Sequence, residues 1–231
     1  MPGYATKQEV IAIAGVDDLI IRSLLDRLQF ADPNGDAERL GISAASWPLF
    51  GLLWPSGAHL AARLADRPVS PTERILEIGC GLALASLVGH RRGANITACD
   101  RHPLAERFLK ENLRANHLAP MKYRHGNWAS TPPRYAGEST LITGEYDLII
   151  GSDLLYERDD NADLALFIDR HASPDAQVWI VDPNRGNRSA FNRQMARVGF
   201  LVREERLKTG ASIGTPAYNG RALTYSRVTT T

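Results

Sequence analysis

RILEIGCGLALA occupies residues 74–85, and ITACD occupies residues 96–100. The first stretch is a short apolar run that breaks at two glycines, Gly79 and Gly81, and then continues with helical character. The second stretch is another apolar run, and it ends on Asp100, 19 positions after Gly81. The pattern predicts a buried strand, a tight turn, a helix and a second buried strand, in that order.

The predicted turn is suited to hold part of a nucleotide. Glycine permits backbone angles and a close ligand approach that a β-carbon would obstruct, and the N–H groups at a helix start attract hydrogen-bonding or anionic groups. Asp100, at the end of the next strand, can accept hydrogen bonds from both hydroxyls of a ribose. We therefore predict an adenosine pocket. The alternative is a buried strand–turn–helix without a ligand.

A missing glycine narrows the choice of ligand. The dinucleotide fingerprint G-x-G-x-x-G has a third glycine where this chain has Leu84. A nicotinamide-dinucleotide oxidoreductase is therefore disfavoured, although the class is kept as an alternative.

The composition is typical of one compact α/β domain. The chain has 231 residues, of which 44% are hydrophobic, so it can bury a full core. The formal net charge is +1 without a block of basic residues, which disfavours a nucleic-acid partner or an anionic membrane surface. No long apolar run or signal-peptide pattern is present, and Cys80 and Cys99 are expected to be reduced thiols. We expect a soluble, cytoplasmic protein.

Apolar runs alternate with helical patterns from residue 75 onward, which predicts a mainly parallel sheet with helices on both faces. The last two strands are predicted to form an antiparallel hairpin at the sheet edge, which makes seven strands in all. The predicted strands are 75–78, 95–100, 121–125, 146–152, 176–182, 200–207 and 221–228. The predicted helices are 82–91, 103–116, 161–171 and 189–198.

The N-terminal part has a different character. We expect residues 1–45 to form an extension, a lid or wall, on a main domain of residues 46–231. Asp17 and Asp18 can cap a helix in this extension. The predicted apolar face of that helix is Ile21, Leu24, Leu25 and Leu28.

Two tryptophans each precede a proline in SWPLFGLLWPSG, residues 46–57. A residue before proline is held extended, and a stiff aromatic side chain can form a wall for a flat base or a substrate side chain. Burial in the core is the alternative for Trp47 and Trp54. Ser56 is predicted to cap a helix whose Leu60 and Leu64 face inward.

Ligands of an open parallel sheet bind beyond the carboxyl ends of its strands. Asn127 and Trp128 follow the third strand and suit an adenine, since an amide can read its edge and an indole can cover its face. A loop turn with a core tryptophan is the alternative. Asp153 and Tyr156 follow the fourth strand, where the acid can hold or orient an amine and the tyrosine can line its channel. Helix capping is the alternative for Asp153.

Asp182 and Arg185 follow the fifth strand. They can bind a substrate carboxylate, or they can pair with each other. Patterns for other chemistries are absent from the sequence: there is no P-loop, no nucleophile elbow and no C-x-x-C, and the six histidines lack ligand spacing. No metal site is therefore predicted.

These motifs together resemble a known family. The pattern E-x-G-x-G at residues 77–81, with the downstream Asp100, resembles motifs I and II of the class I S-adenosylmethionine-dependent methyltransferases, which have a Rossmann-like fold. LWPSG at 53–57, Asn127-Trp128 and SDLLY at 152–156 are similar to the protein-lysine methyltransferases marked by an aspartate-x-x-tyrosine motif.

A narrower resemblance concerns DPNR at residues 182–185. It is similar to the electron-transfer-flavoprotein lysine methyltransferase branch, whose bacterial members are often labelled predicted nicotinamide N-methylases. The resemblance covers residues 47–185. Ala83 departs from it, because most relatives have glycine or serine there, and the first 45 residues match nothing that we can assign.

The resemblance implies S-adenosylmethionine as cofactor and N-methylation of a protein lysine by direct SN2 transfer. It implies Asp153 and Tyr156 as catalytic residues and Asp182 and Arg185 as substrate-binding residues. The implied cofactor-binding residues are Trp54, Glu77, Gly79, Gly81, Asp100, Asn127, Trp128 and Ser152. A small-molecule amine acceptor, a non-catalytic cofactor-binding protein and the oxidoreductase remain alternatives, and the oligomeric state is left open.

Overall fold

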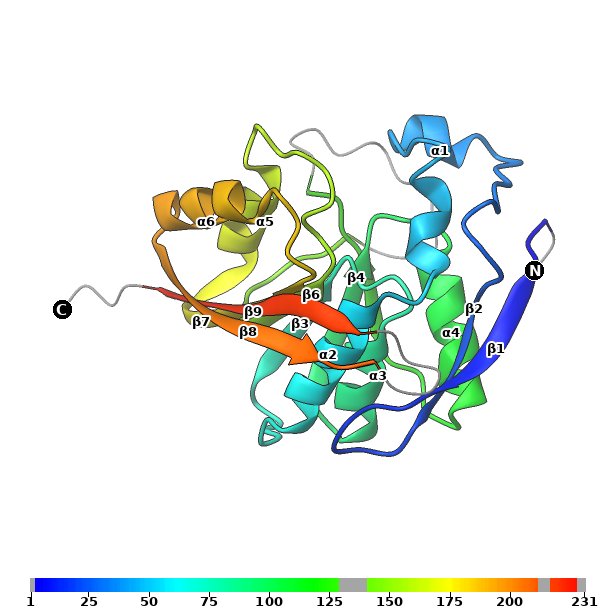
Figure 1. The fold of residues 1–231 in the computed structure, drawn as a ribbon, viewed down its shortest axis with the longest axis horizontal. Coiled ribbons are helices and arrows are strands. Elements are labelled where there is room, and N and C mark those ends of the chain that lie inside the picture. Colours follow the sequence, from blue (N-terminus) through cyan, green and yellow to red (C-terminus); the bar gives the residue numbers. More distant parts are fainter. Residues whose placement is uncertain (1–2, 129–140, 212–216, 228–231) are drawn as a thin grey trace.

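A seven-stranded sheet carries helices on both of its faces (Figure 1). The structure is a computed structural model, and it describes residues 3–128, 141–211 and 217–227. The predicted fold class is confirmed. Within the described ranges, no helix has the length and apolar character needed to cross a bilayer.

The sheet has five parallel strands and an antiparallel pair at one edge. Its strands, in spatial order, are β5 (Lys122–His125), β4 (Asn95–Asp100), β3 (Arg74–Ile78), β6 (Tyr146–Ser152), β7 (Ala172–Asp182), β9 (Tyr218–Arg227) and β8 (Phe200–Thr209). β9 pairs antiparallel with both β7 and β8, so the predicted terminal hairpin is confirmed. Val228, the last residue of the predicted hairpin, lies outside the described residues.

The strand order reverses beside β3. β4 and β5 follow β3 on one side, whereas β6 and β7 lie on its other side. The connections that leave β3 and β6 therefore run in opposite directions across the sheet. The carboxyl ends of these two strands flank the crevice where open α/β sheets bind ligands.

Successive side chains of each buried strand pack alternately against the two helix layers. Ile75 belongs to the hydrophobic core under α2, α3 and α4, whereas the next residue, Leu76, belongs to the core under α5 and α6. The helices are α2 (Pro55–Ala65), α3 (Leu84–Arg91), α4 (Ala105–Ala115), α5 (Asp163–His171) and α6 (Arg188–Arg197). These five agree with the predicted positions to within a few residues.

The helix predicted around residues 19–28 is wrong. Its residues fall in a two-stranded antiparallel hairpin, β1 (Thr6–Ile11) and β2 (Leu19–Leu24), and the short α1 (Asp36–Arg39) follows later. Leu19, Ile21 and Ser23 are buried while Leu28 is 85% exposed, so burial follows the period of two that belongs to a strand.

The hairpin packs into the same core as the sheet. Leu19, Ile21 and Leu24 of β2 belong to the cluster that lies beneath α2, α3 and α4. The domain boundary between residues 45 and 46 stays a prediction.

The two Trp-Pro pairs take different conformations. Trp47 begins a short 3₁₀ helix, η1 (Trp47–Gly51), so the extended conformation predicted for it is wrong. Its side chain is buried, as the core alternative expected. Trp54 is extended (φ −111°, ψ 133°), as predicted. The predicted cap is wrong, because α2 begins at Pro55 without a side-chain cap and the Ser56 hydroxyl instead bonds the Tyr218 hydroxyl at 2.8 Å.

Asn112 of α4 and Asn116, the residue that caps its C-terminal end, attach the hairpin to this helix. Asn112 accepts a hydrogen bond from the Arg22 amide (2.7 Å) and donates one to the Arg22 carbonyl (3.3 Å). Asn116 does the same with Ile20, at 2.9 and 2.7 Å. Four helical residues rise about 6 Å and two strand residues about 6.6 Å, so the two spacings match. The helix thus supplies the hydrogen-bonding partners that a further strand would offer β2.

Asn112→Ala is expected to destabilise the protein by about 2 kcal/mol, because it leaves the amide and carbonyl of Arg22 without their partner. Urea unfolding measures the change. As a control, Asn95→Ala removes an exposed hydrogen bond from Lys122 and is expected to cost about 0.5 kcal/mol or less. Equal losses in the two variants would contradict the attachment.

Candidate active site

The turn between β3 and α3 requires both of its glycines. Gly79 and Gly81 have φ values of +55° and +51°, in the left-handed region that favours glycine. A β-carbon on Gly79 would lie 2.5 Å from the Leu154 side chain, and one on Gly81 would lie 2.8 Å from the Phe50 carbonyl oxygen. Conformation and space therefore select glycine at both positions.

Asp100 ties this turn to the end of β4. One carboxylate oxygen accepts a hydrogen bond from the Gly81 amide and the other accepts one from the His102 amide, both at 2.8 Å. Burial raises the pKa of Asp100, while the two amides and the Arg101 charge oppose that shift. The predicted proximity of the glycine turn and this acid is confirmed.

Glu77 lies beneath the turn and is buried. Its carboxylate accepts a hydrogen bond from the Ser86 amide of α3 at 2.8 Å. Burial raises the pKa of Glu77 to about 7, and the Ser86 hydrogen bonds only partly offset it. The acid links β3 to the first turn of α3 and so supports the loop between them.

Ala83 marks the departure from the glycine pattern. It occupies the N-cap position of α3 with a φ of +60°, and it is fully buried. Alanine in this conformation costs about 1 kcal/mol relative to glycine, which explains why small residues suit the position.

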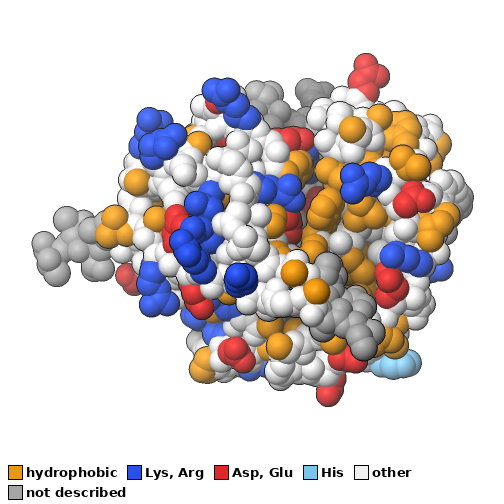
Figure 2. Space-filling model, viewed as in Figure 1, with side chains coloured by type: hydrophobic (Ala, Val, Ile, Leu, Met, Phe, Trp, Pro, Cys, Tyr) orange, Lys and Arg blue, Asp and Glu red, His pale blue; other side chains and the backbone are white. Residues whose placement is uncertain are grey.

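A cavity of about 990 Å³, including its open mouth, lies over the turn. Figure 2 shows a hollow near the centre of the viewed face with apolar side chains along its right-hand side. Ten of the twelve predicted site residues line the cavity: Trp54, Glu77, Gly79, Gly81, Asp100, Trp128, Ser152, Asp153, Tyr156 and Arg185. The strand ends therefore bring together residues that lie far apart in the sequence.

Asn127 and Asp182 are the two that do not line this cavity. Asn127 lies on the wall of an adjoining groove, which shares Trp128 with the cavity. Trp128 lies against the turn, with its ring 3.3 Å from the position of a β-carbon on Gly79. Adenine binding by Asn127 and Trp128 stays a prediction.

Asp153 follows β6 directly and is 8% exposed. Its Oδ1 pairs with Nη2 of Arg185 at 2.8 Å, whereas its Oδ2 is buried without a hydrogen-bond partner among the described residues. The φ of Asp153 is +57°, an uncommon conformation for a residue other than glycine, and such conformations gather at functional sites. The helix-capping alternative is wrong, because Asp159 accepts the first amides of α5.

Asp182 is fully buried below the cavity wall. Its carboxylate accepts a hydrogen bond from the Arg185 backbone amide at 2.7 Å, while the Arg185 guanidinium turns to Asp153. The predicted alternative of an ion pair between Asp182 and Arg185 is therefore wrong. Asp182 positions the segment that carries Arg185, and substrate contact by Asp182 stays a prediction.

Tyr156 lies between the cavity and the adjoining groove and is 38% exposed. Burial of its hydroxyl raises the pKa of Tyr156, and the nearby Arg101 opposes that shift. The side chain is thus placed at the passage from the groove into the cavity, where the prediction of a channel residue puts it.

Phe50 and His102 also line the cavity, although neither is among the predicted site residues. The His102 ring stacks on Phe50 with a centroid distance of 3.7 Å, and it meets the edge of Trp47 at 4.3 Å. Burial lowers the pKa of His102 well below its ordinary value, so the ring is neutral. Nothing in the sequence marks Phe50 as a residue of the cavity wall. The position of His102 just after β4 does mark it as a candidate, because ligands bind at strand ends.

Comparison with known proteins agrees with this geometry. A family model described as lysine methyltransferase matches residues 51–197. Protein N-lysine methyltransferase METTL21A of Xenopus tropicalis is 30% identical over 175 residues, which are 72% of this chain and 73% of that protein. The electron transfer flavoprotein beta subunit lysine methyltransferase of Danio rerio is 30% identical over 112 residues, which are 48% of this chain and 40% of that protein.

Four of the matched relatives are described as electron transfer flavoprotein beta subunit lysine methyltransferases. This chain covers only 40% to 59% of their length. Among solved structures, a ribosomal protein L11 methylase from Lactobacillus delbrueckii subsp. bulgaricus superimposes with a TM-score of 0.56. It is 19% identical and the match covers 76% of this chain and 80% of that one, which supports the fold.

Gly79→Ala is expected to weaken binding of S-adenosylhomocysteine about tenfold or more, because the added methyl group displaces Leu154 and the turn. Gly93→Ala is the matched control: Gly93 also has a positive φ (+84°), but no atom lies within 4 Å of its β-carbon position. The control is expected to cost about 1 kcal/mol of stability and to leave affinity unchanged. Calorimetric titration that finds equal affinities in both variants would contradict this account.

Glu77→Gln isolates the contribution of the buried carboxyl group. Its pKa rises from 4.5 to about 7 on folding, so the folded protein retains a proton that the unfolded chain releases between these values. The associated stabilisation is complete below pH 4.5 and is lost as the pH rises through 7. Relative to Glu77→Gln, the unmodified protein is expected to lose of the order of 3 kcal/mol between pH 4.5 and about pH 8.

Urea unfolding of both proteins without ligand, repeated across this pH range, measures the difference. The comparison cancels the titration of groups that do not interact with Glu77, whereas the charge interaction between Glu77 and Asp100 is part of the measured difference. A difference that stays constant with pH would show that Glu77 is ionised throughout.

Proposed function

The chain belongs to the S-adenosylmethionine-dependent lysine methyltransferase family, and we propose that it transfers a methyl group to the side-chain amine of a lysine in a protein. The observation that carries the proposal is the placement of two buried acids, Asp100 and Asp153, at different strand ends around one cavity. Asp100 lies beside the glycine turn, and Asp153 lies at the end of β6. The first acid is suited to the cofactor and the second to the acceptor.

The residues of the turn fit S-adenosylmethionine. Gly81 lines the cavity in a left-handed conformation that favours glycine. The two Asp100 oxygens each accept one backbone amide and retain lone pairs for ribose hydroxyls. Glu77 places an acid beneath the same turn, where a cationic ligand would favour its ionised form. When bound, S-adenosylmethionine supplies an activated methyl group for direct displacement by the amine.

Asp153 is proposed to orient the acceptor amine. Its unpaired Oδ2 can accept an N–H of the amine, and this hydrogen bond directs the nitrogen lone pair into the cavity. Arg185, which holds Oδ1, places a positive charge nearby that disfavours the ammonium form. A lysine amine has an ordinary pKa of about 10.4, so this charge and desolvation both help it to lose its proton before transfer.

The open mouth of the cavity favours a protein acceptor over a small amine. Four residues, Arg101, Trp128, Leu154 and Tyr156, line both the cavity and the adjoining groove. A groove of this kind admits a side chain that stays attached to a larger body, whereas a closed pocket would favour a free metabolite. We also propose a reducing compartment such as the cytoplasm, because Cys80 and Cys99 are buried free thiols.

Asp153→Asn is expected to lower methyl transfer about 100-fold while affinity for S-adenosylhomocysteine changes little. An amide side chain cannot orient the acceptor amine or accept its proton as a carboxylate does. Asp100→Ala is expected to weaken that affinity about 10-fold or more, since it removes the acceptor for two amides and the ribose. Calorimetry measures affinity for both variants. Equal losses of affinity would contradict the assigned roles.

Transfer is measured with tritiated S-adenosylmethionine and a cell lysate, followed by separation of protein from small molecules. Label in methyl-lysine after acid hydrolysis of the protein fraction supports the proposal. Label in a methylated amine, separated from the donor by chromatography, with none in the protein fraction would favour the amine alternative.

A further inference from the structure

A second groove lies beside the active site and is lined by positive charge. It is formed where the loop after β7 and the start of α6 meet the β8–β9 pair. Among the described residues, its lining contains Arg185, Arg188, Arg206, Lys208 and Arg221 and no acidic residue. Figure 2 shows Lys and Arg side chains gathered beside the central hollow, over the region of α6 and the β8–β9 pair in Figure 1. The chain as a whole has a net charge of only +1, so this concentration is local.

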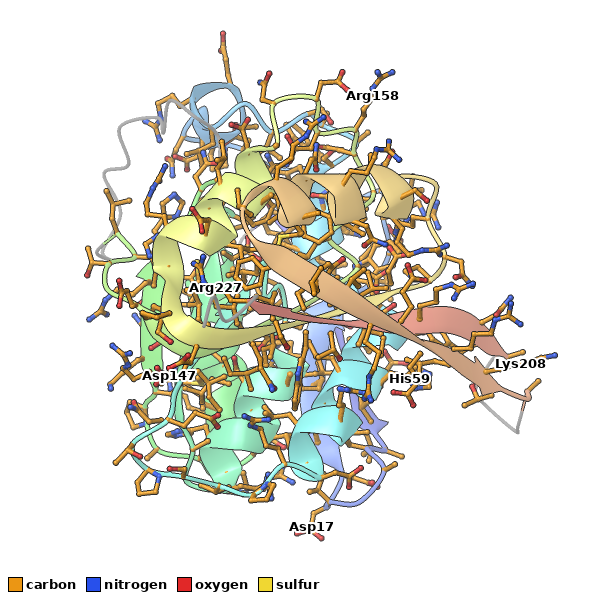
Figure 3. All side chains as sticks on the ribbon, turned by 90° about the vertical axis from the view of Figure 1, so that its left-hand side faces the viewer. Asp17, His59, Asp147, Arg158, Lys208 and Arg227 are labelled. Carbon is orange, nitrogen blue, oxygen red and sulfur yellow. The ribbon has the colours of Figure 1, made fainter. Side chains whose placement is uncertain are left out.

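Internal ion pairs account for only part of this charge. Arg188 and Arg221 share Glu204, at 3.6 and 3.1 Å, and Arg185 pairs with Asp153. Arg206 and Lys208 are exposed on β8 and have no acidic partner among the described residues. In Figure 3, Lys208 lies near the free end of the β8–β9 pair, and its side chain points away from the body of the protein.

Two arginines of the groove face each other across the β8–β9 pair, an arrangement that does not stabilise the fold. Arg206 of β8 lies directly opposite Arg221 of β9 in the strand register. Like charges at opposed positions destabilise a strand pair. An anionic ligand between them would remove this repulsion.

The start of α6 adds to the positive potential. Gly186, Arg188 and Ser189 line the groove, and α6 has neither a side-chain cap nor an acidic residue in its first turn. The amides and the helix dipole therefore favour an anion at the same place as the arginines. The lining contains no aromatic residue on which a nucleic-acid base would stack, which favours a carboxylate ligand over single-stranded RNA.

We propose that this groove binds an acidic segment of the protein acceptor, next to the lysine that enters the cavity. The inference rests on the proposed function. Arg185 lines both the groove and the cavity, so a chain in the groove lies next to Asp153. Glutamate or aspartate side chains then pair with Arg206 and Lys208, and this pairing selects lysines in acidic surroundings.

Binding of a fluorescein-labelled peptide tests the proposal. The probe has one lysine flanked on both sides by glutamates, and its partner has glutamine in place of every glutamate. Fluorescence anisotropy with the full chain and saturating S-adenosylhomocysteine is expected to show about tenfold tighter binding of the glutamate peptide, with a difference that shrinks as salt is added.

Lys208→Glu and Arg206→Glu are each expected to remove most of this preference. Both residues are exposed, and Arg206→Glu replaces a repulsion with an ion pair to Arg221, so folding should be retained. Arg203→Glu is the matched control, because it makes the same change of charge on the same strand outside the groove lining. It is expected to leave the preference intact.

Equal binding of the two peptides, or equal losses in Arg203→Glu and Lys208→Glu, would overturn the proposal. Tighter binding of a labelled polyuridylate with the same dependence on Lys208 would overturn it in favour of RNA. Methyl transfer is measured separately on both peptides. Binding that depends on the glutamates of the peptide, without any methyl transfer, would count against the lysine methyltransferase activity. The groove would then remain a binding site for acidic peptides.

Discussion

The hydrogen bond from the Gly81 amide to the Asp100 carboxylate is the interaction on which the cavity depends. It joins the turn after β3 to the end of β4, two neighbouring parallel strands whose register sets Ile78 opposite Cys99. Gly79 and Gly81 both adopt left-handed conformations in this turn, which glycine permits more readily than other residues. Strand register, glycine conformation and acid position must therefore agree before a ligand site exists.

Buried acids give this site its electrostatic character. Burial raises the pKa of Glu77, Asp100 and Asp182, and backbone amides offset part of the cost in each case. Asp153 is balanced instead by the Arg185 guanidinium. A cationic ligand reduces the cost of ionising these acids, and both a sulfonium cofactor and a lysine acceptor are cationic before transfer.

Segments on both sides of the range that the family model matches lie next to the site. The family model covers residues 51–197, so the wall formed by Trp47 and Phe50 precedes it and the β8–β9 pair follows it. The wall contacts Gly81 through the Phe50 carbonyl oxygen, and the hairpin beside it is held on α4 by Asn112 and Asn116. Arg206, Lys208 and Arg221 of the basic groove also lie beyond the matched range. The matched range thus contains all the residues proposed to act on the cofactor and the acceptor amine, while the flanking segments lie beside the cavity.

The sequence by itself determined the seven strands, the glycine turn and ten residues of the cavity lining, because these depend on local periodicity and on strand ends that meet at one edge of a sheet. Only the tertiary structure decided the form of residues 19–24. A short apolar run fits both helical and strand periods, and the asparagines that fix it as a strand lie 90 and 96 positions away along the chain. The partner of Arg185 was decided in the same way: Asp182 is near in sequence and accepts the Arg185 backbone amide, but the guanidinium pairs with Asp153, which follows another strand.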